Sequence, residues 1–76
     1  MTSAAGVIVQ SVDRALDILE CFAGQSVELG ISEMSEKMEL SKSTIYGLVN
    51  TLVAKGYLEQ NVQTKRYRLG IKLFEF

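Results

Sequence analysis

The strongest constraint on the fold of this chain is the spacing of apolar residues between Ile31 and Asn50. The segment reads ISEMSEKMELSKSTIYGLVN, and two short stretches with helical spacing are separated there by a tight turn at residues 38–40. In the second stretch, apolar side chains fall on one helical face and polar side chains on the other. Two short helices joined by a turn of a few residues form a helix-turn-helix, and the pattern predicts this motif over residues 31–50.

The segment before this motif predicts another helix. Ser11 is expected to cap that first helix and Gly24 to end it, because these residue types favour the two positions. Residues 27–29 are compatible with a short strand. The apolar residues of the first helix recur at spacings of three and four and form one stripe: Val12, Ala15, Leu16, Leu19, Phe22 and Ala23.

Within the motif, Ser32 is expected to cap the second helix, whose inner face carries Ile31, Met34 and Met38. Ser41 is expected to cap the third helix, and Gly56 to end it. The buried stripe of the third helix comprises five apolar residues: Ile45, Leu48, Val49, Leu52 and Val53. Its opposite face carries small or polar residues: Lys42, Ser43, Tyr46, Gly47 and Asn50.

A basic hairpin is predicted after the third helix. Residues 57–60 are a plausible strand, residues 61–65 form a polar turn, and residues 66–69 alternate basic and apolar side chains. The fold class is therefore mainly α with a small β wing, a winged helix-turn-helix. We expect a tail over residues 1–10, the domain over residues 11–70 and the start of a linker helix over residues 71–76. The apolar last segment suggests that the chain is the front part of something longer.

Composition excludes several classes of function. The chain has 76 residues, no histidine and a single cysteine, Cys21. An internal disulfide, a catalytic pair of histidine with serine or cysteine, and a structural zinc site are therefore ruled out. We expect no enzyme activity, no metal and no cofactor. No apolar run approaches the roughly 18 residues of a membrane helix, so we expect no membrane partner.

The overall net charge of −1 conceals a division between the two halves of the chain. Residues 1–39 hold two basic and seven acidic residues, whereas residues 40–76 hold six basic and two acidic residues. The basic half contains the third helix and the hairpin. Nucleic acid responds to the local field of a basic face and not to the sum of all charges. The pattern indicates that DNA is the partner.

The residue types on the third helix suit contact with double-stranded DNA. Short polar side chains at its N-terminus can bind phosphate, and asparagine further along the same face can pair with adenine. Each residue taken singly is also compatible with an ordinary solvated surface. The predicted DNA-binding residues are Ser32, Ser41, Lys42, Ser43, Thr44, Tyr46, Gly47, Asn50, Lys65 and Arg66.

Four sequence motifs together resemble the N-terminal domain of the IclR family of bacterial transcription regulators. They are SVDRALDIL at residues 11–19, SKSTIY at residues 41–46 followed by Leu48 and Leu52, GYL at residues 56–58, and RYRLG at residues 66–70. The resemblance covers residues 11–76. It implies a cytoplasmic repressor or activator that binds palindromic operators as a homodimer or a dimer of dimers. It also implies a linker helix and a C-terminal domain that binds a small-molecule effector.

Two positions depart from the family pattern. Gly47 stands where the family often has an arginine that can contact DNA, so specificity carried by that arginine does not transfer. Glu39 stands in the turn where the family usually has glycine. Because a glutamate with positive φ is strained, we expect this turn to differ locally from the family's.

The apolar residues at the two ends of the domain predict a two-fold interface between the first helix and the terminal helix. The expected interface residues are Leu19, Phe22, Phe74 and Phe76. An alternative from another class remains: a winged helix that binds protein and not DNA. The acidic first half of the chain is compatible with that role.

Overall fold

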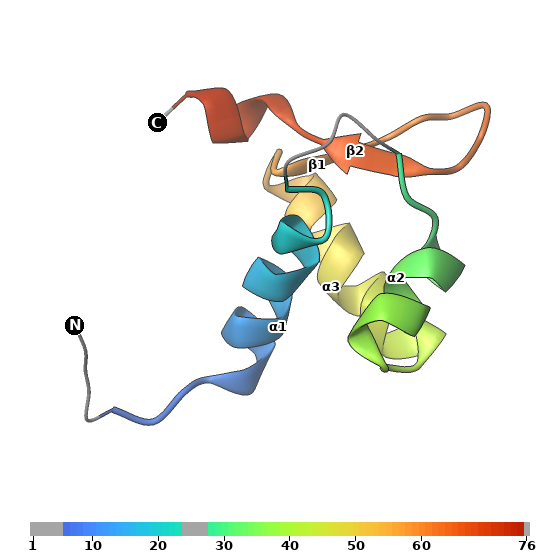
Figure 1. The fold of residues 1–76 in the computed structure, drawn as a ribbon. Coiled ribbons are helices and arrows are strands. Elements are labelled where there is room, and N and C mark those ends of the chain that lie inside the picture. The colour runs from blue at the N-terminus through green and yellow to red at the C-terminus, as the bar shows by residue number, and fades with distance from the viewer. Residues whose placement is uncertain (1–5, 24–27, 76) are drawn as a thin grey trace.

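The computed structural model describes residues 6–23 and 28–75 of the chain. The elements in chain order are α1 (Gln10–Glu20), α2 (Ile31–Met38), α3 (Lys42–Ala54), β1 (Leu58–Gln60), β2 (Tyr67–Leu69) and a 3₁₀ turn (Ile71–Phe74). Figure 1 shows the antiparallel β1–β2 hairpin lying across one end of the three helices, with its turn on the α2 side. This architecture confirms the predicted winged helix-turn-helix.

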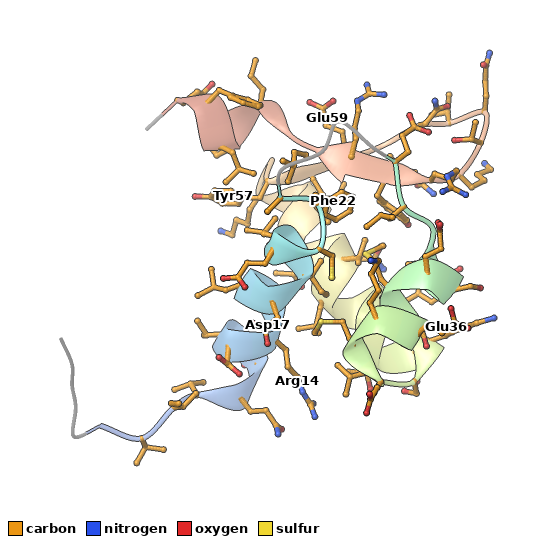
Figure 2. The ribbon with its side chains drawn as sticks, viewed as in Figure 1. Arg14, Asp17, Phe22, Glu36, Tyr57 and Glu59 are labelled. Carbon is orange, nitrogen blue, oxygen red and sulfur yellow. The ribbon has the colours of Figure 1, made fainter. Side chains whose placement is uncertain are left out.

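One apolar core joins all the helices and strands. It draws on residues from each of them and on Leu29, which precedes α2. Phe22, directly after α1, is only 1% exposed and lies close to the hairpin in Figure 2. The buried core residues are Ile18, Phe22, Leu29, Met34, Ile45, Val49, Leu52, Leu58 and Tyr67.

Helix α1 begins earlier than the sequence predicts, and only part of its predicted stripe, Ala15, Leu19 and Phe22, packs into or against the core. Its N-cap is Val9, whose carbonyl accepts the first helical hydrogen bond from the Asp13 amide at 3.0 Å, so Ser11 lies inside the helix. The C-cap is Cys21, and the predicted cap Gly24 lies outside the described residues. Ile18, which the predicted stripe omits, is the fully buried residue of α1.

Two residues of the predicted stripe, both in the N-terminal half of α1, lie at the surface and not in the core. Val12 is 56% exposed and Leu16 is 55% exposed, although both have the spacing of core residues. They line an apolar groove between α1 and α3 with Ala15, Leu48 and Thr51.

Helix α2 is capped by Gly30 and not by Ser32, which lies exposed in its first turn. The Glu33 carboxylate accepts a hydrogen bond from the Gly30 amide at 2.7 Å. A glutamate at the third helical position satisfies the backbone N–H of the cap residue, and its charge suits the positive end of the helix dipole. The predicted inner face is confirmed, with Met34 fully buried and Ile31 and Met38 packed beside the core.

Helices α2 and α3 end in the same hydrogen-bonding pattern with different residues. After α2, the amide of Leu40 bonds the Ser35 carbonyl at 3.2 Å and that of Glu39 bonds the Glu36 carbonyl at 3.3 Å. Residues 52–57 repeat this pattern at the end of α3 around Gly56, as predicted. These paired bonds define a Schellman motif, which needs a left-handed residue. Glu39 supplies it with φ of 56°, so the expectation that this turn differs locally is wrong.

The hairpin pairs three residues on each strand: Leu58 with Leu69, Glu59 with Arg68, and Gln60 with Tyr67. Leu29 adds a bridge on the other side of β2, because its backbone exchanges two hydrogen bonds with Tyr67 at 2.9 and 2.8 Å. Leu29 thus bears out part of the short strand expected there, whereas Val27 lies outside the described residues. The hairpin is therefore fixed by backbone bonds at the strand pair next to its turn, as well as by the core.

Candidate nucleic-acid interface

The polar face of α3 is exposed along the first three turns of the helix. Ile45 and Val49 point into the core, and this orientation turns the residues between them outward. Tyr46 is 50% exposed. The residues predicted to face away from the core are all exposed: Lys42, Ser43, Tyr46, Gly47 and Asn50.

The cap of α3 uses two of the predicted hydroxyls within the protein. The Ser41 hydroxyl accepts a hydrogen bond from the Thr44 amide at 3.3 Å, which confirms Ser41 as the N-cap. The same hydroxyl donates to the Thr44 hydroxyl at 3.0 Å. Ser43 lies exposed beside them, with its hydroxyl 3.4 Å from that of Ser41. The cap therefore fixes the direction in which α3 starts and leaves Lys42 and Ser43 at its exposed tip.

A hollow brings together predicted residues from three elements that are distant in sequence. Ser32 comes from the first turn of α2, Tyr46 from α3, and Lys65 and Arg66 from the turn of the wing. Gly30, Ile31, Glu33 and Thr64 complete its lining. The structure thus joins the polar face of α3 to the wing turn in one surface.

The wing arginines are held by acidic residues of the same protein. A terminal nitrogen of Arg66 lies 2.7 Å from the Glu33 carboxylate and donates to the Glu28 carbonyl at 2.8 Å. Arg68 pairs with Glu59 at 3.2 Å and with Glu28 at 3.6 Å. Among the residues that the structure describes, Lys65 and Lys42 form no ion pair. These two lysines are therefore the cations most available to phosphate on this surface.

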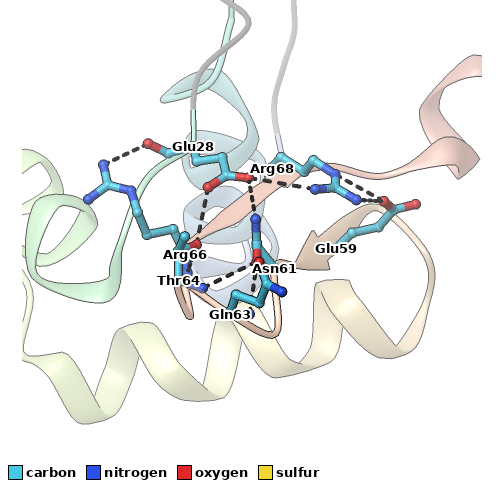
Figure 3. Close-up of polar contacts among 7 residues, drawn as sticks. All are labelled: Glu28, Glu59, Asn61, Gln63, Thr64, Arg66 and Arg68. Carbon is cyan, nitrogen blue, oxygen red and sulfur yellow. Dashed lines mark hydrogen bonds and ion pairs between the residues drawn. The ribbon is translucent and has the colours of Figure 1, made fainter.

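Glu28 is the centre of a polar network that ties the segment before α2 to the wing (Figure 3). Its carboxylate accepts a hydrogen bond from the Asn61 side-chain amide at 3.1 Å and from the Thr64 hydroxyl at 3.2 Å. Asn61 in turn accepts bonds from the amides of Gln63 and Thr64, at 2.9 and 3.2 Å. One carboxylate therefore holds both ends of the wing turn.

These contacts favour the ionised forms of Glu28 and Glu33. The Asn61 hydrogen bond, followed by that from Thr64 and the charges of Arg68 and Arg66, lowers the pKa of the Glu28 carboxyl. The backbone hydrogen bond from Gly30, and then Arg66, lowers the pKa of the Glu33 carboxyl. Both carboxylates are therefore negative at neutral pH and offset the arginines of the wing.

Sequence reasoning missed Glu28, Glu33, Asn61 and Thr64. The position of Glu33, three residues after a small residue and before an apolar helix, is a signal for a helix start that was available in the sequence. Glu28 offers no such signal, because its partners lie 33 and 36 residues further along the chain. Only the folded wing brings them together.

The residues expected at a dimer interface differ in how far they are exposed. Phe22 is buried in the core and has no surface to offer a second molecule, so its assignment to an interface is corrected. Leu19 is partly buried and packs against the core. Phe74 is 76% exposed, and Phe76 lies outside the described residues.

Residues 6–23 and 28–75 contain neither a metal-binding cluster nor a membrane-spanning helix. No cluster of three or more histidine, cysteine, aspartate or glutamate residues in these ranges has the arrangement to hold a metal ion. Within the same ranges, no helix has the length and apolarity that crossing a membrane requires.

Comparisons with known proteins point to one family. Residues 11–62 match the profile of the IclR helix-turn-helix domain. The chain is 52% identical over 68 residues to the HTH-type transcriptional regulator XynR of Escherichia coli strain K12, an alignment that covers 90% of this chain and 27% of XynR. It is 39% identical over 67 residues to the HTH-type transcriptional regulator KdgR of Dickeya chrysanthemi, covering 88% of this chain and 22% of that protein.

A solved structure agrees with the sequence relatives. The crystal structure of an IclR family transcriptional regulator from Brucella abortus superimposes with a TM-score of 0.81 at 35% identity. The match covers 93% of this chain and 29% of that chain. This chain therefore spans about a quarter of the length of the relatives that it matches.

Proposed function

This chain belongs to the IclR family of helix-turn-helix transcription regulators, and we propose that it binds double-stranded operator DNA with α3 in the major groove. The observation that carries the proposal is the exposed polar face of α3, which continues through one hollow into the wing turn. A helix of this kind enters the major groove with its N-terminal residues foremost, and an adjoining wing reaches the flanking backbone.

Individual roles follow from the position of each residue on α3. Lys42 and Ser43 at the exposed start of the helix would meet phosphate oxygens, and Ser41 and Thr44 would orient them through the cap. Two turns further along, Asn50 has the donor and acceptor needed to pair with adenine in the major groove.

Tyr46 and Gly47 form the middle of the proposed reading face. The phenol of Tyr46 is long enough to meet a phosphate or the methyl group of a thymine. Gly47 has no neighbour within 4 Å of where a side chain would begin, so DNA can approach the backbone closely at this position.

The wing and the start of α2 would contact the DNA backbone on either side of the groove. Lys65 lies exposed at the wing turn, and Ser32 lies exposed in the first turn of α2. One terminal nitrogen of Arg66 bonds Glu28 and Glu33, and the other nitrogens of its guanidinium would contact the DNA backbone.

In the cell, two copies would bind a palindromic operator in the cytoplasm. The apolar groove at the start of α1, with Val12 and Leu16, and the exposed Phe74 of the C-terminal turn supply the surface for a two-fold contact. A small-molecule effector would act through a further domain, in the part of the longer relatives that this chain does not match.

Binding to random-sequence duplex DNA at two salt concentrations tests the proposal. The wild-type chain should bind, and its affinity should fall as salt rises because phosphate contacts release counterions. The double variant Lys42→Ala, Asn50→Ala should bind more weakly at both salt concentrations. Absence of binding at low salt by the folded chain would contradict the proposal and would favour a winged helix that binds protein.

A matched control tests whether the loss belongs to the proposed face. The double variant Lys55→Ala, Gln10→Ala removes one cation and one amide from exposed positions at the far end of α3 and the start of α1. It should bind DNA nearly as well as the wild-type chain. An equal loss in both double variants would show that charge alone, and not the face of α3, determines binding.

A further inference from the structure

We infer that Glu28 is a positioning residue that holds the wing turn where Lys65 can reach the DNA bound by α3. The inference rests on the proposed function and goes beyond it, because an acidic residue at a DNA-binding surface is expected to repel phosphate. The geometry assigns Glu28 the opposite effect, through the wing residues that its carboxylate holds.

The two carboxylate oxygens of Glu28 have separate partners. One oxygen accepts from the Thr64 hydroxyl at 3.2 Å, and the other accepts from the Asn61 amide at 3.1 Å and lies 3.6 Å from Arg68 (Figure 3). All three partners belong to the wing. The carboxylate therefore spans the wing from its turn to its second strand.

The residues that Glu28 holds are those that shape the turn around Lys65. Asn61 accepts from two turn amides through its side chain and from the Lys65 amide through its carbonyl, the last at 2.7 Å. The Thr64 hydroxyl accepts from the Arg66 amide at 3.2 Å. Lys65 itself has φ of 65°, a conformation that a non-glycine residue keeps only when its surroundings enforce it.

Backbone bonds alone do not fix this turn against the rest of the protein. The bridge between Leu29 and Tyr67 secures the strand pair next to the turn. Further toward the turn, the described contacts with the segment before α2 and with α2 itself run through side chains, those of Glu28, Glu33 and Arg66. Loss of the Glu28 carboxylate therefore releases the Asn61 and Thr64 side chains that shape the turn around Lys65, while the contacts of Arg66 with Glu33 and with the Glu28 carbonyl stay in place.

Glu59 provides a matched control for charge. Its carboxylate pairs with Arg68 at 3.2 Å on the same wing, and it bonds none of the described turn residues. Glu28→Ala and Glu59→Ala remove the same charge, and both changes should strengthen the general attraction to DNA equally. A difference between the two variants therefore reports the position of the turn.

The test is a double-mutant cycle on binding to random-sequence duplex DNA over a series of salt concentrations. In the wild-type chain and in Glu59→Ala, adding Lys65→Ala should make the slope of log affinity against log salt shallower by about 1, the loss of one phosphate contact. In Glu28→Ala, adding Lys65→Ala should leave the slope unchanged. The same loss of slope in all three backgrounds would overturn the inference.

A second measurement covers the case in which Glu28→Ala does not fold. Glu28→Gln keeps one acceptor oxygen, loses the charge and is less disruptive. Its Lys65 amide should show a lower ¹⁵N heteronuclear Overhauser effect than in Glu59→Gln, while the Tyr67 amide stays rigid in both. Equal values for Lys65 would overturn the inference. Absence of salt-dependent binding by the wild-type chain would instead refute the proposed function, and the inference with it.

Discussion

Gly47 lies on the exposed face of α3, one residue after Tyr46 and one turn before Asn50. Its φ is negative, so the helix does not require a glycine there, and no atom outside its own helix turn lies within 4 Å of where a Cβ would be. The Thr51 hydroxyl donates to its carbonyl at 2.9 Å. Nothing in the packing of the free protein therefore explains the glycine, whereas the proposed close approach of DNA to the backbone would.

Replacing Gly47 with alanine should change the stability of the chain and its binding to DNA in different ways. Gly47→Ala should raise the free energy of unfolding by about 0.5–1 kcal/mol, because alanine loses less backbone entropy in a helix. Urea unfolding followed by circular dichroism measures this change. The same variant should bind duplex DNA no more tightly than the wild-type chain. A loss of stability would show that the site is more crowded than the structure indicates.

At the scale of elements, the helices of the motif and the wing were predictable because their signals are local. Ser41 caps α3 and Gly56 ends it as predicted, since each acts on residues three to five positions away in sequence. The start of α2 was misplaced by two residues, because Glu33 makes Gly30 an adequate cap without a hydroxyl. Glu39 shows that two Schellman bonds can hold a glutamate in a left-handed conformation.

The errors on α1 have a different cause. Helical spacing identifies a face but does not say how far along the helix its neighbours extend. Val12 and Leu16 have core spacing, but they line an open groove with Leu48 and Thr51 of α3 and stay more than half exposed. Ile18 is buried because α2 and α3 both reach that level of the helix. The Glu28 network could not be predicted from the sequence either, because its partners meet only in the tertiary structure.

At the scale of the molecule, the acidic residues of α1 and the lysines of α3 and the wing lie on different parts of the surface. Asp13, Asp17 and Glu20 lie exposed on α1, where they line a hollow that also includes Arg14 and Lys37. The unpaired lysines Lys42 and Lys65 lie on the surface shared by α3 and the wing. If the chain binds DNA as proposed, such a distribution would orient the domain toward DNA before contact, despite an overall charge of −1.

The apolar groove at the start of α1 predicts self-association. The chain should show a monomer–dimer equilibrium in sedimentation experiments at increasing concentration, and Leu16→Lys should shift it strongly toward monomer. Val62→Lys is a matched control, because Val62 is also an exposed apolar residue, 78% against 55% for Leu16, but lies on the wing turn. A wild-type chain that remains monomeric at every concentration would exclude this groove as the interface.

Mapping of backbone amide shifts during titration of the ¹⁵N-labelled chain with duplex DNA tests the central claim most directly. If α3 and the wing read DNA together, the largest changes should fall in residues 42–50 and 62–66 and in the first turn of α2. The acidic surface of α1 should remain unaffected. Changes centred on α1, or a bound spectrum in which residues 42–50 do not move, would contradict the account.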